Sequence, residues 1–134
     1  MAAFEFPIRV YWEDTDAGGI VFYANYLKFF ERARTEWLRA RGVQQRALRE
    51  QSGGMFVVVE ATLKYHRPAR LDDELIVTAR LQDSGRAALT IAQQARLAGA
   101  GDLLCEGAIR IGWVDGASMK PARIPPALIE KLNS

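Results

Sequence analysis

The chain has 134 residues, of which 49% are hydrophobic and 25% are charged, and these proportions are ordinary for a single globular domain over residues 1–134. Its net charge of +2 and its scattered arginines argue against nucleic acid or an anionic membrane as a partner. The sequence shows no signal peptide and no apolar run long enough to cross a membrane, and its single cysteine excludes an internal disulfide, so we expect a cytoplasmic protein.

The first part of the chain predicts one strand followed by one long helix. Apolar residues alternate over residues 4–13, and Pro7 places this strand at the edge of a sheet. The residues on its apolar face are Phe4, Phe6, Ile8, Val10 and Trp12. From Tyr23 to about Arg41 the apolar side chains recur at helical spacing, and Gly42 is a stop signal.

After a short helix expected over residues 43–50, the rest of the chain is almost wholly strand-like. Four strands are predicted, over residues 56–65, 74–82, 87–97 and 103–114. Hairpin turns are predicted at residues 83–85 and 99–101, and a last short helix at residues 125–132. A broad apolar helix face and an apolar sheet face can bury each other, so we expect an α+β domain in which a curled antiparallel sheet of about five strands wraps the long helix.

Residues 13–26, EDTDAGGIVFYANY, contain the most informative pattern of the sequence. Two carboxylates, Asp14 and Asp16, precede the glycine pair Gly18 and Gly19, and the long helix is expected to begin at about Tyr23. The first amides of a helix lack partners and carry partial positive charge from the helix dipole. A carboxylate beside such amides suits acyl chemistry, because the carboxylate can attack or activate water while the amides stabilise the oxyanion.

Several of these residues also have a structural interpretation. Aspartate is favoured in turns and helix caps, which applies to Asp16, and for Asp14 we favour a structural hydrogen bond. Glu31, two turns into the helix, is either an ion-pair partner of Arg34 or Arg32 or a polar group at the far end of an acyl pocket. The residue pattern favours the ion pair.

The remaining polar and titratable residues that we considered do not indicate a second catalytic or metal site. His66 is the only histidine, and without a GxSxG serine or a second histidine we expect it to be structural. Cys105 lies in an apolar run and is expected in the core, and Asn25 is expected to make a local hydrogen bond. One cysteine and one histidine do not make a metal site, and no nucleotide-binding glycine motif is present, so neither a metal nor a cofactor is expected.

The segment EDTDAGGIVFYANYLKFFERARTEWL resembles the signature of the 4-hydroxybenzoyl-CoA thioesterase-like hotdog proteins. Within that family the chain is most similar to the bacterial acyl-CoA thioesterases associated with the Tol-Pal system. The similarity continues through LKYHRPARLDDELIV and VDGASMKPARIPPALIEKL, so it covers nearly the whole chain. It implies a hotdog fold and the hydrolysis of an acyl-CoA thioester to a free acid and coenzyme A.

The resemblance also implies roles for individual residues. Asp16 matches the family's catalytic carboxylate, and Tyr23 matches the helix-start residue whose backbone N–H polarises the thioester carbonyl. Gly18 and Gly19 match the turn that admits the thioester, and Glu31 matches an acidic position that contacts the acyl group in hydroxybenzoyl-specific relatives. The chain departs from the family at Tyr23, where Tol-Pal-associated members often have histidine.

The resemblance further implies partners. Coenzyme A carries phosphates, so basic residues should line one rim of the site, and on charge alone the candidates are Arg86, Arg67 and Arg70. An acyl-carrier protein is a second possible thioester donor, and a homodimer or a homotetramer is expected. The alternatives are a non-catalytic acyl-CoA or acyl-carrier-protein binding or scaffold module and a hotdog dehydratase, which would need a catalytic histidine. The sequence leaves open which acyl group is bound. It also leaves open whether Asp16 acts as a nucleophile or as a general base.

Overall fold

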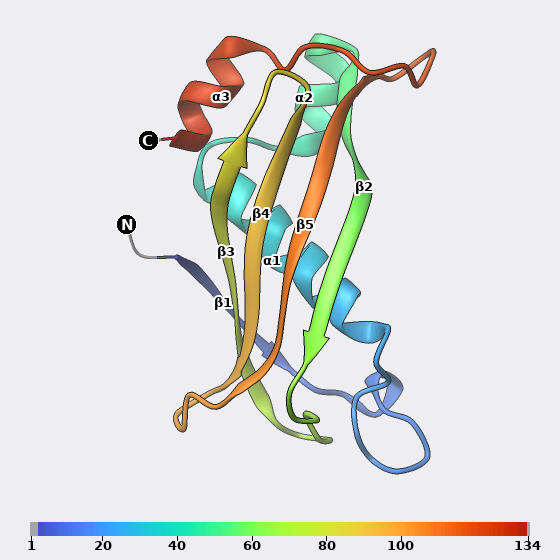
Figure 1. Ribbon diagram of the computed structural model, residues 1–134, viewed down its shortest axis with the longest axis vertical. Helices are drawn as coiled ribbons and strands as arrows, with labels where there is room; N and C mark the ends of the chain where they lie inside the picture. Colours follow the sequence, from blue (N-terminus) through green and yellow to red (C-terminus); the bar gives the residue numbers. More distant parts are fainter. Residues whose placement is uncertain (1–2, 134) are drawn as a thin grey trace.

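The chain folds into a curled five-stranded antiparallel sheet wrapped around one long helix, in a computed structural model that describes residues 3–133 (Figure 1). The strands follow the spatial order β1-β3-β4-β5-β2. The strands are β1 (Phe4–Arg9), β2 (Gly54–Tyr65), β3 (Glu74–Ser84), β4 (Ala88–Leu97) and β5 (Leu103–Asp115). The helices are α1 (Asn25–Ala40), α2 (Gln45–Ser52) and α3 (Pro126–Asn133), with a 3-10 turn at Trp12–Asp14. The α+β architecture and its five strands, expected from the sequence, are confirmed.

The core lies between α1 and the inner face of the sheet. Along α1, one stripe of side chains at helical spacing is almost completely buried, and it consists of Tyr26, Phe29, Phe30, Ala33 and Trp37. The sheet supplies the opposite face with alternating side chains such as Leu75, Val77, Ile91 and Ile109, each at most 1% exposed. Each large side chain buried in this way stabilises the fold by about 1.5–3 kcal/mol, so this packing determines where α1 lies.

Two boundaries near the N-terminus differ from those expected. Strand β1 ends at Arg9, and Trp12, expected on its apolar face, is 79% exposed because the 3-10 turn redirects the chain. Helix α1 begins at Asn25 instead of Tyr23. The Asn25 N–H donates to the Phe22 carbonyl oxygen at 2.8 Å, so residues 22–25 form a turn that leads into the helix.

The two outer strands of the sheet differ in how they are protected. Strand β1 carries Pro7 and is an edge strand, as expected from the sequence. Strand β2 forms the other edge, where Val58 and Val59 are 53% and 56% exposed. Within residues 3–133 no further strand pairs with β2, so a long edge with exposed valines is left open. None of the helices described in residues 3–133 is long and apolar enough to span a membrane.

Cys105 on β5 is fully buried, as the sequence led us to expect. Burial, with a smaller contribution from the charge of Glu106, raises the pKa of its thiol to about 12. The ordinary thiol pKa in an unfolded chain is about 8.5, so the folded state holds its proton to a higher pH than the unfolded state does. This contribution to stability is complete below pH 8 and is lost as the pH rises toward 12.

We therefore predict that the stability advantage of the wild type over Cys105→Ala shrinks above pH 9. The free energies of unfolding in urea, compared at pH 7.5 and pH 10, should show the difference between the two proteins falling by about 1–2 kcal/mol, since each pH unit is worth about 1.4 kcal/mol for one group. Tyrosines and lysines titrate in the same pH range, but their contribution to stability is the same in both proteins and cancels in the difference. A difference that stays constant with pH would contradict the assignment.

Candidate active site

Asp16 lies in a small hairpin loop that precedes α1. Thr15 and Val21 pair across the loop, and the Asp16 N–H donates to the Ile20 carbonyl oxygen at 2.9 Å. The exposed Asp16 side chain accepts a hydrogen bond at Oδ1 from the Gly18 N–H at 2.8 Å. The turn interpretation of Asp16 is therefore correct, and the carboxylate still keeps acceptor sites that face solvent.

The two glycines serve this loop in different ways. Gly19 has a φ of +77°, in the left-handed region where a side chain would strain the backbone. A Cβ atom on Gly18 would lie 3.2 Å from Asp16 Oδ1, so any side chain there would crowd the carboxylate. Together they keep the chain close to the carboxylate without covering it.

Asp14 ties the base of the loop to its surroundings. Its side chain is 2% exposed and accepts the Tyr11 N–H at Oδ2 at 2.8 Å. Its carbonyl oxygen accepts the Phe22 N–H at 3.0 Å and the Asn25 Nδ2–H at 2.8 Å. The structural role expected for Asp14 is confirmed, whereas the Asn25 side chain bonds a carbonyl 11 residues earlier instead of making a local bond, and these bonds hold the Asp16 loop against the start of α1.

The start of α1 presents free backbone donors. The Tyr23 and Ala24 N–H groups have no hydrogen-bond acceptor among residues 3–133, and Ala24 is the N-cap of the helix. Their positive dipole end lies at the base of the loop that carries Asp16. Tyr23 is 63% exposed, so the start of α1 lies at the surface of the molecule.

A second segment, residues 69–71, supports the loop from the other side. The Val21 N–H donates to the Ala69 carbonyl oxygen at 2.9 Å, and Ile20 pairs with Arg70. The Ala69 N–H in turn donates to the buried Tyr26 hydroxyl at 3.0 Å. Arg70, one of the three arginines named from charge alone, therefore lies beside the Asp16 loop.

The tyrosines that hold this segment and the helix start were not identified from the sequence. Helical spacing places Tyr26 on the apolar helix face and alternation places Tyr65 at the end of a strand, and neither pattern indicates a partner for the hydroxyl. The Tyr65 hydroxyl donates to the Tyr23 carbonyl oxygen at 2.9 Å, across 42 residues of sequence. The one feature of the sequence that could have indicated these hydrogen bonds is that both tyrosines stand among apolar residues. A tyrosine hydroxyl that is buried usually finds a partner.

Glu31 lies away from the loop, in a groove between α1 and β2. The groove has a volume of about 520 Å³ and is lined by Leu27, Lys28, Glu31, Arg32, Arg34, Val58, Ala61 and Ile109. Within residues 3–133 no salt bridge joins Glu31 to Arg34 or Arg32, so of the expected ion pair only a charge interaction with Arg34 is present, and Glu31 Oε2 accepts the Thr35 hydroxyl at 3.4 Å. Arg34 instead donates to the buried amide oxygen of Gln93 at 2.9 Å, and burial lowers the pKa of its guanidinium, partly offset by the charge of Glu31.

Arg86 is not brought to the Asp16 loop. It lies in the hairpin between β3 and β4, at the end of the sheet opposite the loop that precedes α1 (Figure 1). Strand β3 has 11 residues, so at about 3.3 Å per residue its ends lie roughly 35 Å apart. In one chain Arg86 and Asp16 therefore belong to separate regions.

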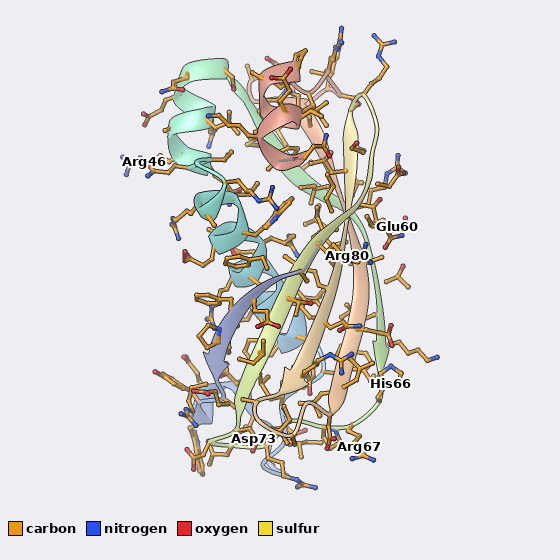
Figure 2. The ribbon with its side chains drawn as sticks, turned by 90° about the vertical axis from the view of Figure 1, so that its left-hand side faces the viewer. Arg46, Glu60, His66, Arg67, Asp73 and Arg80 are labelled. Carbon is orange, nitrogen blue, oxygen red and sulfur yellow. The ribbon has the colours of Figure 1, made fainter. Side chains whose placement is uncertain are left out.

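His66 and Arg67 lie at the same end of the sheet as Asp73, near the loop (Figure 2). His66 Nε2 lies 2.7 Å from Glu106 Oε2, and Arg67 pairs with Asp102 at 3.2 Å. These pairs fit the structural role expected for His66. Nowhere in residues 3–133 do three or more His, Cys, Asp or Glu side chains gather as metal ligands would.

Comparison with known proteins gives consistent results. The model of the thioesterase-like superfamily matches residues 10–132. Acyl-CoA thioester hydrolase YbgC of Escherichia coli O6:H1 is 41% identical over 131 residues, covering 97% of this chain and 96% of the relative. Acyl-CoA thioesterase YbgC of Haemophilus influenzae is 43% identical over 122 residues, covering 91% and 88%. The crystal structure of a probable thioesterase from Bartonella henselae superimposes with a TM-score of 0.85 at 32% identity, covering 92% and 100%, which agrees with the hotdog fold.

We predict that Asp14→Ala lowers the free energy of unfolding by about 1–2 kcal/mol, because it removes a buried acceptor and leaves the Tyr11 N–H without a partner. The matched control is Glu13→Ala, which truncates the exposed acid beside it in the same 3-10 turn. Chemical denaturation of both variants measures the effect. Equal stability of the two variants would show that the Asp14 carboxylate does not hold the loop.

Proposed function

We propose that this chain, which belongs to the thioesterase-like superfamily, hydrolyses acyl-CoA thioesters at the junction of the Asp16 loop and the start of α1. One observation carries the proposal. An accessible carboxylate is held in a loop that is hydrogen-bonded directly to a helix start with unpartnered N–H groups. That pair of features supplies both requirements of acyl transfer, a base or nucleophile and an oxyanion donor.

The thioester carbonyl oxygen would accept the Tyr23 N–H, with the helix dipole adding to the stabilisation of the oxyanion. One such donor is typically worth about 3–4 kcal/mol of barrier. As general base, Asp16 takes a proton from water, the water oxygen attacks the carbonyl carbon, and the C–S bond breaks as Asp16 returns the proton to the leaving sulfur, which releases the CoA thiol and the acid. As nucleophile, Asp16 forms a mixed anhydride that water then hydrolyses. Both routes need an ionised carboxylate.

The remaining site residues serve substrate binding in this proposal. Gly18 and Gly19 let the thioester approach the backbone beside Asp16. Glu31 lines a groove that follows α1 away from its start, and there it would meet the acyl group. Arg70, next to the loop, is placed to meet a CoA phosphate, whereas Arg86 would reach such a site only from a second chain.

A homodimer, or a homotetramer of two dimers, is part of the same proposal. The open β2 edge with its exposed Val58 and Val59 supports it, because a second chain would cover those groups. A cytoplasmic location, thioesters of an acyl-carrier protein and an association with the Tol-Pal system rest on the resemblance to the Tol-Pal-associated thioesterases.

We predict that Asp16→Asn lowers thioester hydrolysis by about 10²–10⁴-fold, because the substitution keeps the size and the turn while removing the carboxylate charge. Released thiol is followed with short, long and aromatic acyl-CoAs, which also gives the substrate class. Asp83→Asn, an exposed acid near the far end of β3, is the matched control. Equal rates for Asp16→Asn and the wild type would remove Asp16 from the reaction. Binding of acyl-CoA without turnover by the wild type would favour the non-catalytic module.

A second prediction isolates the backbone donor. Proline suits the second position of the Phe22–Asn25 turn, so Tyr23→Pro deletes the Tyr23 N–H without opposing the turn, whereas Tyr23→Ala removes the ring and keeps the N–H. We expect kcat to fall by about 10²–10³-fold in the proline variant and by less than about tenfold in the alanine variant. Equal losses in the two variants would assign the effect to the tyrosine ring instead.

A further inference from the structure

Tyr65 is the last residue of β2, and its side chain reaches the start of α1. Its ring meets the Tyr23 ring nearly edge-on, with centroids 6.2 Å apart, and the Tyr26 ring at 5.6 Å. Its hydroxyl donates to the Tyr23 carbonyl oxygen at 2.9 Å. This contact falls on the residue whose N–H is the oxyanion donor in the proposed reaction.

The contact restrains one peptide group. A peptide is planar and trans, so fixing the Tyr23 carbonyl also fixes the N–H of Ala24, which points the opposite way. That N–H, like the Tyr23 N–H, has no acceptor among residues 3–133. A hydrogen bond accepted by a carbonyl also polarises its peptide and makes the attached N–H a stronger donor.

We infer that Tyr65 is a positioning residue for thioester hydrolysis, which holds the Tyr23–Ala24 peptide so that the free N–H groups of Tyr23 and Ala24 stay aligned on the oxyanion. The inference rests on the proposed function and deepens it, by adding the Ala24 N–H as a second donor. Donors aligned before the substrate arrives need no reorganisation during the reaction, which is the condition for strong oxyanion stabilisation.

The neighbouring bonds show that the hydroxyl is not needed to close the turn. The Asn25 N–H already bonds the Phe22 carbonyl, and the Asp14 carbonyl already holds both Phe22 and Asn25. Neither bond restrains the carbonyl of Tyr23. The Tyr65 ring is 45% exposed, and its contacts with Tyr23 and Tyr26 do not require the hydroxyl. The hydroxyl therefore restrains the rotation of the Tyr23–Ala24 peptide group.

The experiment compares Tyr65→Phe with the wild type in steady-state hydrolysis of the best acyl-CoA substrate. We expect kcat to fall by about 5–30-fold, less than for complete loss of a donor, with KM changed by less than about twofold. The melting temperature should stay within about 3 °C of the wild type, because a half-exposed hydroxyl contributes little to folding. In the Asp16→Asn background, the Kd for acyl-CoA should not change when Tyr65→Phe is added.

A double-mutant cycle with Tyr23→Pro tests whether Tyr65 acts through the helix start. The combined loss in kcat should be smaller than the product of the two separate losses, because the Tyr23 N–H and the Ala24 N–H held by Tyr65 bind the same oxyanion and their effects are therefore coupled. Multiplicative losses would overturn the inference, as would an unchanged kcat, a rise in KM alone or loss of the fold in Tyr65→Phe.

If the wild type hydrolyses no thioester, the proposed function fails. If Asp16→Asn abolishes turnover and Tyr65→Phe does not lower it, only the role of Tyr65 fails.

Discussion

Burial of the aromatic stripe of α1 against the inner face of the sheet is the interaction on which the rest of the structure depends. Phe29, Phe30 and Trp37 are at most 2% exposed, so the helix cannot slide or turn without opening the core. The same stripe begins with Tyr26, whose hydroxyl accepts the Ala69 N–H. The start of α1 is thereby fixed relative to the end of the sheet, and its free N–H groups gain a defined position.

The candidate site is supported by backbone contacts more than by side-chain chemistry. The Asp14 carbonyl joins the Asp16 loop to α1, the Ala69 carbonyl holds Val21, and Tyr65 holds the Tyr23 carbonyl. The catalytic groups in this account are one carboxylate and one or two amides. Because amides cannot be altered by ordinary substitution, their contribution is tested through the side chains that orient them. Tyr65 is such a side chain, with a smaller expected effect on hydrolysis than Asp16.

Sequence pattern alone was enough for the elements whose apolar spacing is long and regular. Strands β3 and β5 and the stripe of α1 follow from alternation and helical spacing, and the Asp16 loop with its glycine pair follows from composition. Trp12 was misplaced because a 3-10 turn interrupts an alternation that looks continuous. Helical spacing allows an ion pair between Glu31 and an arginine, whereas the hydrogen bond of Arg34 goes to Gln93, which is distant in sequence. Tyr65 and Arg86 depend on contacts across the sheet, which local patterns do not encode.

In the proposed reaction, one thioester carbonyl meets both Asp16 and the start of α1. The most direct test is a crystal structure of the protein with a non-hydrolysable acyl-CoA analogue in which a methylene group separates the carbonyl from sulfur. We predict that the carbonyl oxygen lies within about 3.1 Å of the Tyr23 N, with an Asp16 carboxylate oxygen close enough to reach the carbonyl carbon directly or through one water. A carbonyl bound away from the helix start, or out of reach of Asp16, would contradict the account.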